Sequence, residues 1–300
     1  MNTIIECVPN FSEARSSKTL GALREAASSV SGAGLLDVHV DVDHNRSVFT
    51  LAGEPDAMAE VAFLLASVAV RCIDLNEHDG CHPFMGAVDV IPFVPIKNAT
   101  MADCVELARQ VGERIAKELN LPVFLYEEAA TSAHRRNLAD IRRGGFVGMA
   151  EKIKQPEWTP DFGECVPHPT AGVVAVGARK PLIAFNINLN TSNIEIAKAI
   201  AMAVRGSSGG LVYCKALGMF LNERGIAQVS MNLTDYESTP IYRVFEMVRL
   251  EAKRYGVAII GSELVGLAPT KALVDCAEYF LRLEQFDMDK HLLESRTERI

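Results

Sequence analysis

A short polar turn that ends in a histidine leads directly into a strand-forming segment. The turn covers residues 77–82, and residues 88–94 that follow are rich in β-branched side chains. A turn that feeds a strand can hold a side chain still while leaving it open to a ligand, and histidine titrates near neutral pH. His82 is therefore a candidate for proton transfer in catalysis, although a single histidine beside a strand is more often a polar surface or packing residue.

The same turn contains a second histidine at a spacing that could suggest a metal site. His78 and His82 would share one face of a helix, as metal-binding pairs do. Gly80 and Pro83 disfavour a helix here, and no glutamate follows His78 in the order found in metalloproteases. We therefore expect no metal.

Three cations stand where they could bind a carboxylate. Arg46 closes the polar turn over residues 41–46, and Arg179 and Lys180 precede the first strand of the second half. A guanidinium can hold a carboxylate through two parallel hydrogen bonds. The alternatives are a solvated hairpin turn for Arg46 and a solvated linker for the other two.

Polar side chains recur on two strands of the second half. Asn186 and Asn188 alternate with apolar residues, as do Ser230, Asn232 and Thr234. Alternation places each set on one face of its strand. Buried amides need hydrogen-bond partners, which either a polar ligand or structural hydrogen bonds would supply.

Composition excludes several classes of protein. The 300 residues carry a formal net charge of -8 and a pI near 5.5. No basic run or stripe is present, which argues against nucleic acid as a partner. We expect small-molecule substrates and leave room for a homodimer.

The cysteines and the apolar runs point to the cytoplasm. The seven cysteines are scattered without CxxC spacing, which is typical of reduced thiols. The N-terminus has no secretory pattern, and the longest apolar run, residues 61–70, is too short to cross a bilayer. We expect a cytoplasmic protein without a membrane partner.

The first half has the order β-α-β-β-α-β, which is the ferredoxin-like pattern. The expected strands are 3–8, 35–40, 48–52 and 88–94, and the expected helices are 16–30 and 54–73. A helix over 101–119, a strand over 123–126, a mostly helical stretch over 127–154 and a loop over 155–171 follow. Such a loop is too long for a simple connector, and long loops are often functional.

The second half repeats this order. We expect strands over 182–189, 212–221, 227–233 and 257–260, helices over 194–204 and 240–255, and a last helix over 270–283. Residues 212–221 also suit a helix. The sequence thus predicts an α/β (α+β) fold of two ferredoxin-like subdomains, 1–179 and 180–300, with their sheets facing each other across a ligand crevice.

Several long segments resemble the glutamate formimidoyltransferase family. The start of the chain carries ECVPNFSE at 6–13, and LDV, NRSV, HP and MGA follow at 36–38, 45–48, 82–83 and 85–87. Further matches are QPEWTPDFG, GARK, IAFNINL, AQVS and GSELVGL, which begin at residues 155, 177, 183, 227 and 261. Their length and order make the resemblance specific over most of the chain.

The resemblance implies a folate-dependent transferase of histidine degradation and one-carbon metabolism. Such enzymes move a formimino group from N-formimino-L-glutamate to tetrahydrofolate, a co-substrate, with two α/β subdomains around a groove. The family's catalytic histidine falls on His82. Its folate-binding loop falls on Gly163, Glu164, Cys165, Val166, Pro167, His168, Pro169, Thr170, Ala171 and Gly172. We expect a stand-alone form without the cyclodeaminase domain of animal members.

Two other functions remain open at this point. The first is a related folate enzyme that acts on 5-formyltetrahydrofolate. The second is a non-catalytic ferredoxin-like binding protein, because this fold serves many functions.

Overall fold

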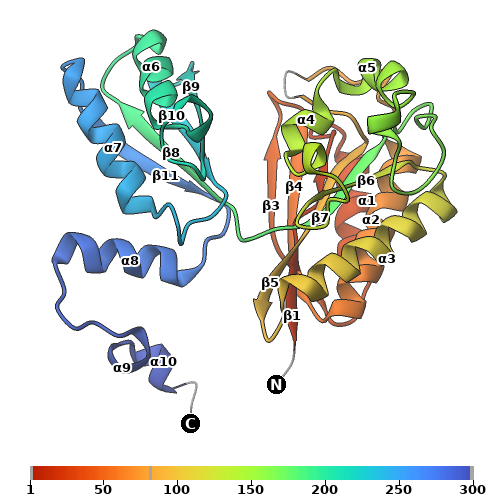
Figure 1. The fold of residues 1–300 in the computed structure, drawn as a ribbon, viewed down its shortest axis with the longest axis horizontal. Coiled ribbons are helices and arrows are strands. Elements are labelled where there is room, and N and C mark those ends of the chain that lie inside the picture. Colours follow the sequence, from red (N-terminus) through yellow and green to blue (C-terminus); the bar gives the residue numbers. More distant parts are fainter. Residues whose placement is uncertain (1–2, 81–82, 298–300) are drawn as a thin grey trace. The chain divides into compact units, whose positions relative to one another are not determined.

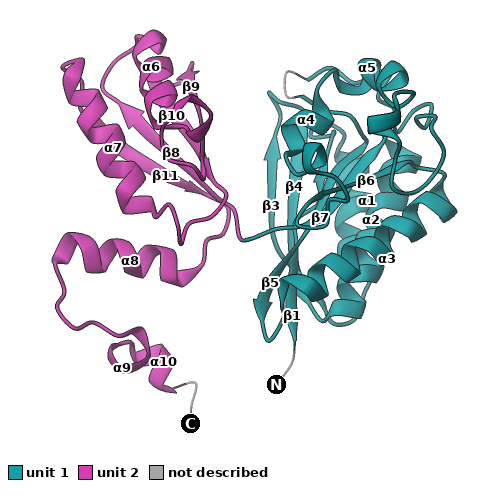
Figure 2. Cartoon of the chain, in the orientation of Figure 1, with its two compact units in different colours: residues 1–180 teal, residues 181–300 magenta. Residues whose placement is uncertain are grey.

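The computed structural model describes residues 3–80 and 83–297 (Figure 1). The chain divides into two compact units, Met1–Lys180 and Pro181–Ile300 (Figure 2). His82 lies outside the described residues.

Unit 1 is built on a mixed sheet in which the described residues form seven strands. The strands are β1 (Ile4–Cys7), β2 (Asn10–Phe11), β3 (Ala33–Asp41), β4 (Arg46–Gly53), β5 (Val88–Lys97), β6 (Val123–Glu127) and β7 (Val174–Ala178). Both β1 and β2 pair with β4 and β5, so they act as one strand with a break at Pro9. With β3 beside β4, this is the ferredoxin-like order, and β7 and β6 extend it in parallel.

Three helices cover one face of this sheet (Figure 1). They are α1 (Ser17–Ser28), α2 (Pro55–Cys72) and α3 (Met101–Leu119). Ser16 caps α1 by accepting from the Thr19 amide, and Thr100 and Asp103 form a capping box at α3. The apolar stripes of the helices bury Leu23, Leu65 and Ile115 against the sheet, and removing this area from water is the main stabilising term.

The opposite face is covered at the β5–β7–β6 end by two short helices, α4 (Leu138–Arg142) and α5 (Gly145–Lys152). They pack over Phe124, Tyr126 and Val90. The prediction of a mostly helical stretch over 127–154 was therefore only partly right. Gly144 and Gly145 adopt positive φ angles of 95° and 61°, which end one helix and begin the next.

The sequence analysis missed β7 and placed the long loop correctly. Residues 155–171 contain only one short 3₁₀ turn, Pro156–Trp158. The apolar run that follows is the buried parallel strand β7, whose residues are all buried. Such a strand has no polar alternation, so its only signal was a short apolar run bounded by glycines.

Unit 2 is a four-stranded antiparallel sheet with the order β11-β8-β10-β9. Its strands are β8 (Ile183–Leu189), β9 (Cys214–Leu221), β10 (Ile226–Leu233) and β11 (Ile259–Val265), and helices α6 (Ile194–Val204) and α7 (Ile241–Arg254) pack on one face. The second predicted β-α-β-β-α-β order is confirmed. Residues 212–221 contain a strand rather than a helix, and β11 begins and ends later than predicted.

One further helix of unit 2 follows β11 and packs against α7. Helix α8 (Thr270–Leu281) packs on α7 through a stacked Tyr242–Tyr279 pair with centroids 4.4 Å apart. Two short helices, α9 (Met288–His291) and α10 (Leu293–Thr297), follow. In the described part of the chain, no helix is long and apolar enough to cross a membrane.

Candidate active site in unit 1

Two loops of unit 1 that carry predicted site residues are hydrogen-bonded to each other. The Ala87 N–H donates to the Ala171 carbonyl at 3.0 Å, and the Val173 N–H donates to the Met85 carbonyl at 3.1 Å. Between them Gly86 and Gly172 form an antiparallel bridge. The segment that follows His82 is thereby joined to the end of the candidate folate loop.

The segment that precedes His82 contacts the same loop. The Leu75 N–H donates to the Thr170 carbonyl at 2.8 Å, and the Asn76 side chain donates to the Pro169 carbonyl at 3.0 Å. Described residues on both sides of His82 are therefore held against the second half of the candidate folate loop.

Gly86 and Gly172 permit this close approach. A Cβ on Gly86 would lie 1.9 Å from the Val173 carbonyl oxygen, and one on Gly172 would lie 2.2 Å from that of Met85. Gly172 also has a φ of +69°, which side chains rarely adopt. A larger residue at either position would force the two loops apart.

Two hollows share Phe84 in their linings. One is a small polar hollow of about 10 Å³, with room for little more than a water molecule, lined by Phe11, Ser12, His44, Asn45, Arg46, His78, Phe84 and Asp89. The other is a shallow hollow of about 300 Å³ with a mainly apolar lining of Gly80, Pro83, Phe84, Gly144, Gly145, Phe146 and Val147. A polar group and a flat apolar ring could thus be held close together.

Arg46 supplies the positive charge of the polar hollow. It stands at the start of β4 and donates to the Asn10 side-chain oxygen. Burial, helped by the neighbouring Arg142 guanidinium, lowers the Arg46 pKa to about 10, against the opposing effect of Asp89. It therefore stays charged at neutral pH, and a bound anion would stabilise that charge further.

Two imidazoles border the same hollow. The His44 Nδ1 lies 2.7 Å from Asp41 Oδ2, so a carboxylate orients its ring. The His78 Nδ1 lies 3.2 Å from the Asn45 amide nitrogen, and burial lowers the His78 pKa. The sequence analysis did not single out His44, because nothing in the pattern shows that this turn meets residues 78–89.

The candidate folate loop fixes the tautomer of its histidine. His168 and Gly172 exchange backbone hydrogen bonds of 2.8 and 3.0 Å, which close a tight turn. Within it, His168 Nδ1 accepts from the Thr170 and Ala171 amides at 3.3 and 3.0 Å. An accepting Nδ1 places the proton of a neutral ring on Nε2. Burial also lowers the His168 pKa, which favours the neutral ring with its proton on Nε2.

The first half of that loop is open to solvent. Residues 163–166 are exposed, and Val166 has 65% of its surface accessible. Ala171 and Gly172 at the other end are buried. Residues 163–166 are therefore accessible to a ligand, while the end of the loop at residues 171–172 is fixed by burial.

Arg179 and Lys180 follow β7 and do not line either hollow. The Arg179 Nη1 donates to the Lys180 carbonyl at 2.9 Å. Burial raises the pKa of the Glu6 carboxyl and the Arg179 charge opposes that rise, so these two residues are electrostatic neighbours. Among the three predicted carboxylate-binding cations, only Arg46 lies in the polar hollow beside the His82 segment.

The amides of unit 2 that the sequence analysis noted have mixed surroundings. Asn188 donates to Glu263 Oε1 and accepts from Gln228, both at 2.8 Å. Glu263 also pairs with Arg224 at 3.2 Å. Structural hydrogen bonds therefore account for Asn188. Asn186 pairs with Ser230 in the strand register and is only partly buried.

The described residues contain no group of three or more histidine, cysteine, aspartate or glutamate side chains that could hold a metal ion.

Comparison with known proteins identifies the class to which the chain belongs. Residues 4–179 match the N-terminal subdomain of the formiminotransferase domain, and residues 184–296 match a second formiminotransferase domain model. The chain belongs to the formiminotransferase family.

Particular relatives match over almost the full length. The chain is 54% identical to a protein of Streptococcus pyogenes serotype M1 named glutamate formimidoyltransferase, covering 98% of this chain and 99% of that one. A Thermoplasma acidophilum protein of the same name is 48% identical, with 99% and 98% covered. Formimidoyltransferase-cyclodeaminase of Mus musculus is 43% identical, and the match covers 95% of this chain and 54% of the length of that protein.

Proposed function

We propose that this protein transfers the formimino group of N-formimino-L-glutamate to tetrahydrofolate, giving 5-formiminotetrahydrofolate and L-glutamate. The observation that carries the proposal is the near full-length identity to two proteins named for this activity. The hydrogen bonds that join residues 85–87 to residues 171–173 are the geometric support for it.

The reaction needs a proton removed from one nitrogen and a proton delivered to another, and one group can do both. The N5 nitrogen of tetrahydrofolate attacks the amidine carbon and loses a proton, and a tetrahedral intermediate forms. The bond from that carbon to the glutamate nitrogen then breaks, and the nitrogen gains a proton. We assign the transfer to His82 on its sequence position, since a pKa near working pH suits both steps.

The substrates can be matched to the described residues by chemistry. The formimino donor carries carboxylates, and we place one of them at the edge of the polar hollow, where the Arg46 charge would attract it. The flat pterin suits the apolar hollow lined by Phe84 and Phe146. We place the folate along residues 163–172, where the Nε2–H of His168 can donate to a carbonyl or carboxylate oxygen. Holding both substrates together lowers the entropic part of the barrier.

The compartment and the co-substrate follow from the same proposal. Tetrahydrofolate acts as a co-substrate, and the protein's partners are small molecules or a second copy of the chain. The described cysteines are all free thiols, including exposed Cys72 and Cys165, which fits a reducing cytoplasm.

Purified protein with N-formimino-L-glutamate and tetrahydrofolate tests the proposal. Glutamate should be released in equal amount to the tetrahydrofolate consumed. A parallel assay with 5-formyltetrahydrofolate examines the related folate chemistry. Tight folate binding without turnover of either donor would contradict the proposed activity and favour a binding protein.

We propose that Arg179, which lines neither hollow, binds a carboxylate on a part of a substrate that extends beyond them. Arg179→Ala should then raise KM for that substrate with little change in kcat. Loss of one charge-assisted hydrogen bond costs about 1.5–3 kcal/mol, which is roughly a 10- to 100-fold rise in KM. Steady-state kinetics with each substrate varied in turn is the measurement. Arg71→Ala, at the exposed end of α2, is the control. Unchanged KM values for both substrates would show that Arg179 binds no substrate carboxylate.

His168→Asn should separate the structural and binding roles of this ring. The asparagine Oδ1 can replace Nδ1 as acceptor for the Thr170 and Ala171 amides, so the turn is kept. The Nε2–H donor is lost, which should cost about 0.5–1.5 kcal/mol and raise KM for tetrahydrofolate roughly 2- to 10-fold. His168→Ala loses both contacts and should also lower Tm. Wild-type kinetics in the asparagine variant would show that Nε2 contacts no substrate.

A further inference from the structure

The segment between β6 and the long loop contains two pairs of adjacent arginines. Arg135 is buried and Arg142 is partly buried, whereas the other member of each pair is exposed. The Arg135 and Arg142 side chains are 8% and 16% exposed, whereas those of Arg136 and Arg143 are 59% and 79% exposed. Withdrawing a guanidinium from water is costly unless carboxylates and carbonyls satisfy it, so Arg135 and Arg142 each mark a specific contact.

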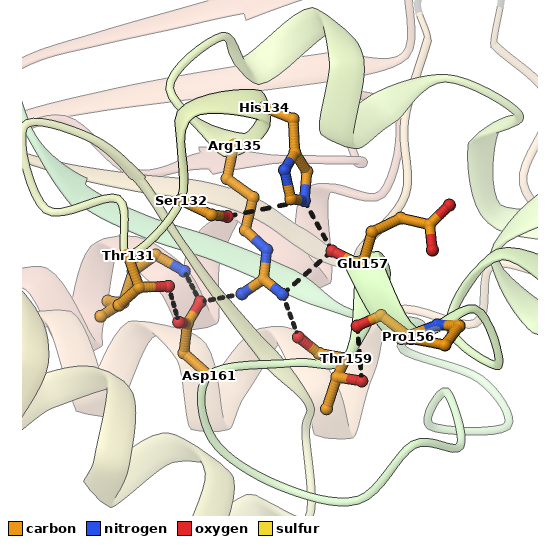
Figure 3. A network of polar contacts seen from close by, with 9 residues as sticks. Thr131, Ser132, His134, Arg135, Pro156, Glu157, Thr159 and Asp161 are labelled. Atoms are coloured by element: carbon orange, nitrogen blue, oxygen red, sulfur yellow. Dashed lines mark hydrogen bonds and ion pairs between the residues drawn. The ribbon is translucent and has the colours of Figure 1, made fainter.

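Arg135 binds the start of the long loop (Figure 3). Its Nη1 lies 2.8 Å from Asp161 Oδ2, and its Nη2 donates to the carbonyls of Glu157, at 3.2 Å, and Thr159. His134 Nε2 lies 2.6 Å from the same Glu157 carbonyl. One side chain thus holds three points of the loop that precedes residue 163.

Asp161 connects this contact to the sheet. Its Oδ2 also accepts from the Leu125 amide of β6 at 2.7 Å, and its Oδ1 accepts from Thr131. The next residue, Phe162, bridges to Val123 on the β6 edge. Gly163 then turns the chain with a φ of +91°. The Arg135–Asp161 pair therefore holds the beginning of the candidate folate loop together with the backbone hydrogen bonds between Val123 and residues 161–162.

Arg142 makes the corresponding contact to the segment after His82. Its Nε and Nη2 lie 2.8 and 2.5 Å from Asp89 Oδ2, and Asp89 Oδ1 accepts from the Met85 amide at 2.8 Å. Asp89 also lines the polar hollow with Arg46. A second arginine–aspartate pair, of buried Asp89 with partly buried Arg142, thus holds the chain between His82 and β5.

We propose that Arg135 and Arg142 are positioning residues for the transfer reaction, each holding one of the two loops that carry the proposed site. Arg135 acts through Asp161 on residues 163–172, and Arg142 acts through Asp89 on residues 83–87. Neither needs to touch a substrate. The inference rests on the proposed function for its kinetic part and on the structure alone for the placement of the loops.

The two arginines should have different kinetic signatures. Displacing a site by about 1 Å can cost on the order of 100-fold in rate or binding. Arg135→Lys keeps the charge and loses the forked contact, so KM for tetrahydrofolate should rise about 10- to 100-fold with kcat nearly unchanged. Arg142→Lys should lower kcat by about 10- to 100-fold with KM for tetrahydrofolate nearly unchanged.

The exposed neighbours provide matched controls. Arg136→Lys and Arg143→Lys change the same residue type one position away, at surface pairs with Glu128 and Asp140. Their kinetic constants should stay within about two-fold of wild type, as surface pairs contribute little. A lysine at position 135 or 142 keeps a positive charge beside Asp161 or Asp89, so Arg135→Lys and Arg142→Lys should fold. Circular dichroism checks this.

Hydrogen exchange of the ligand-free variants separates this inference from the proposed function. Amides of residues 161–172 should exchange faster in Arg135→Lys than in Arg136→Lys, and those of residues 83–89 faster in Arg142→Lys than in Arg143→Lys. If the wild type shows no transfer, the proposed function fails while this comparison still tests the loop contacts. Exchange equal to the controls, or a lowered Tm with wild-type KM and kcat, would overturn the positioning role.

Discussion

Replacement of His82 by alanine is expected to lower kcat about 10²- to 10⁴-fold, which is the usual contribution of a positioned acid–base group. The turn that carries His82 is held on both sides by described hydrogen bonds to residues 169–173, so the loss of one side chain should leave these contacts in place. KM for both substrates should change little, because the imidazole is assigned to proton transfer rather than to substrate binding.

The measurement is steady-state kinetics of folded protein, with circular dichroism and Tm as checks of the fold. His291→Ala is the control, because His291 is exposed on the short helix α9 of unit 2 and has no assigned role. Its kcat should match that of the wild type. Turnover near the wild-type rate in a folded His82→Ala protein would exclude His82 as the proton-transferring residue.

Most of the fold could be predicted because short-range sequence patterns specify the helices and strands of the two ferredoxin-like cores. The helical stripe of α3 and the alternation in β8 and β10 depend on neighbours in sequence, and each element was placed within a few residues. Strand β7 and the short helices α4 and α5 were harder. A buried parallel strand lacks alternation, and α4 and α5 are stabilised mainly by packing over Phe124 and Tyr126.

Residues of the candidate site could be predicted only where residue type alone suggests chemistry. Arg46 was chosen because turn propensity does not explain an arginine, and it does line the polar hollow. Asp89, inside an apolar strand, gave no such signal. Its role depends on Arg142 from α4 and on the Met85 amide, and those contacts exist only after the chain has folded.

Gly86→Ala is the structural change with the largest expected effect. The added Cβ would lie 1.9 Å from the Val173 carbonyl oxygen and 2.7 Å from that of Val88, and neither backbone atom can rotate away. Relief requires breaking the bridge to Gly172 and the 2.8 Å bond from Ser12 Oγ to the Gly86 carbonyl. We expect a loss of about 3 kcal/mol or more in the free energy of unfolding.

For a unit of this size, such a loss should lower Tm by roughly 6–12 °C. Gly148→Ala is the matched control. Gly148 lies in helix α5 with no atom within 4 Å of an added Cβ, so alanine there should stabilise by about 0.5–1 kcal/mol. Activity provides a second readout, since a separated bridge would move the segment after His82 away from residues 163–172. A Gly86→Ala protein with wild-type Tm and kcat would show that the contact between these loops is looser than the structure indicates.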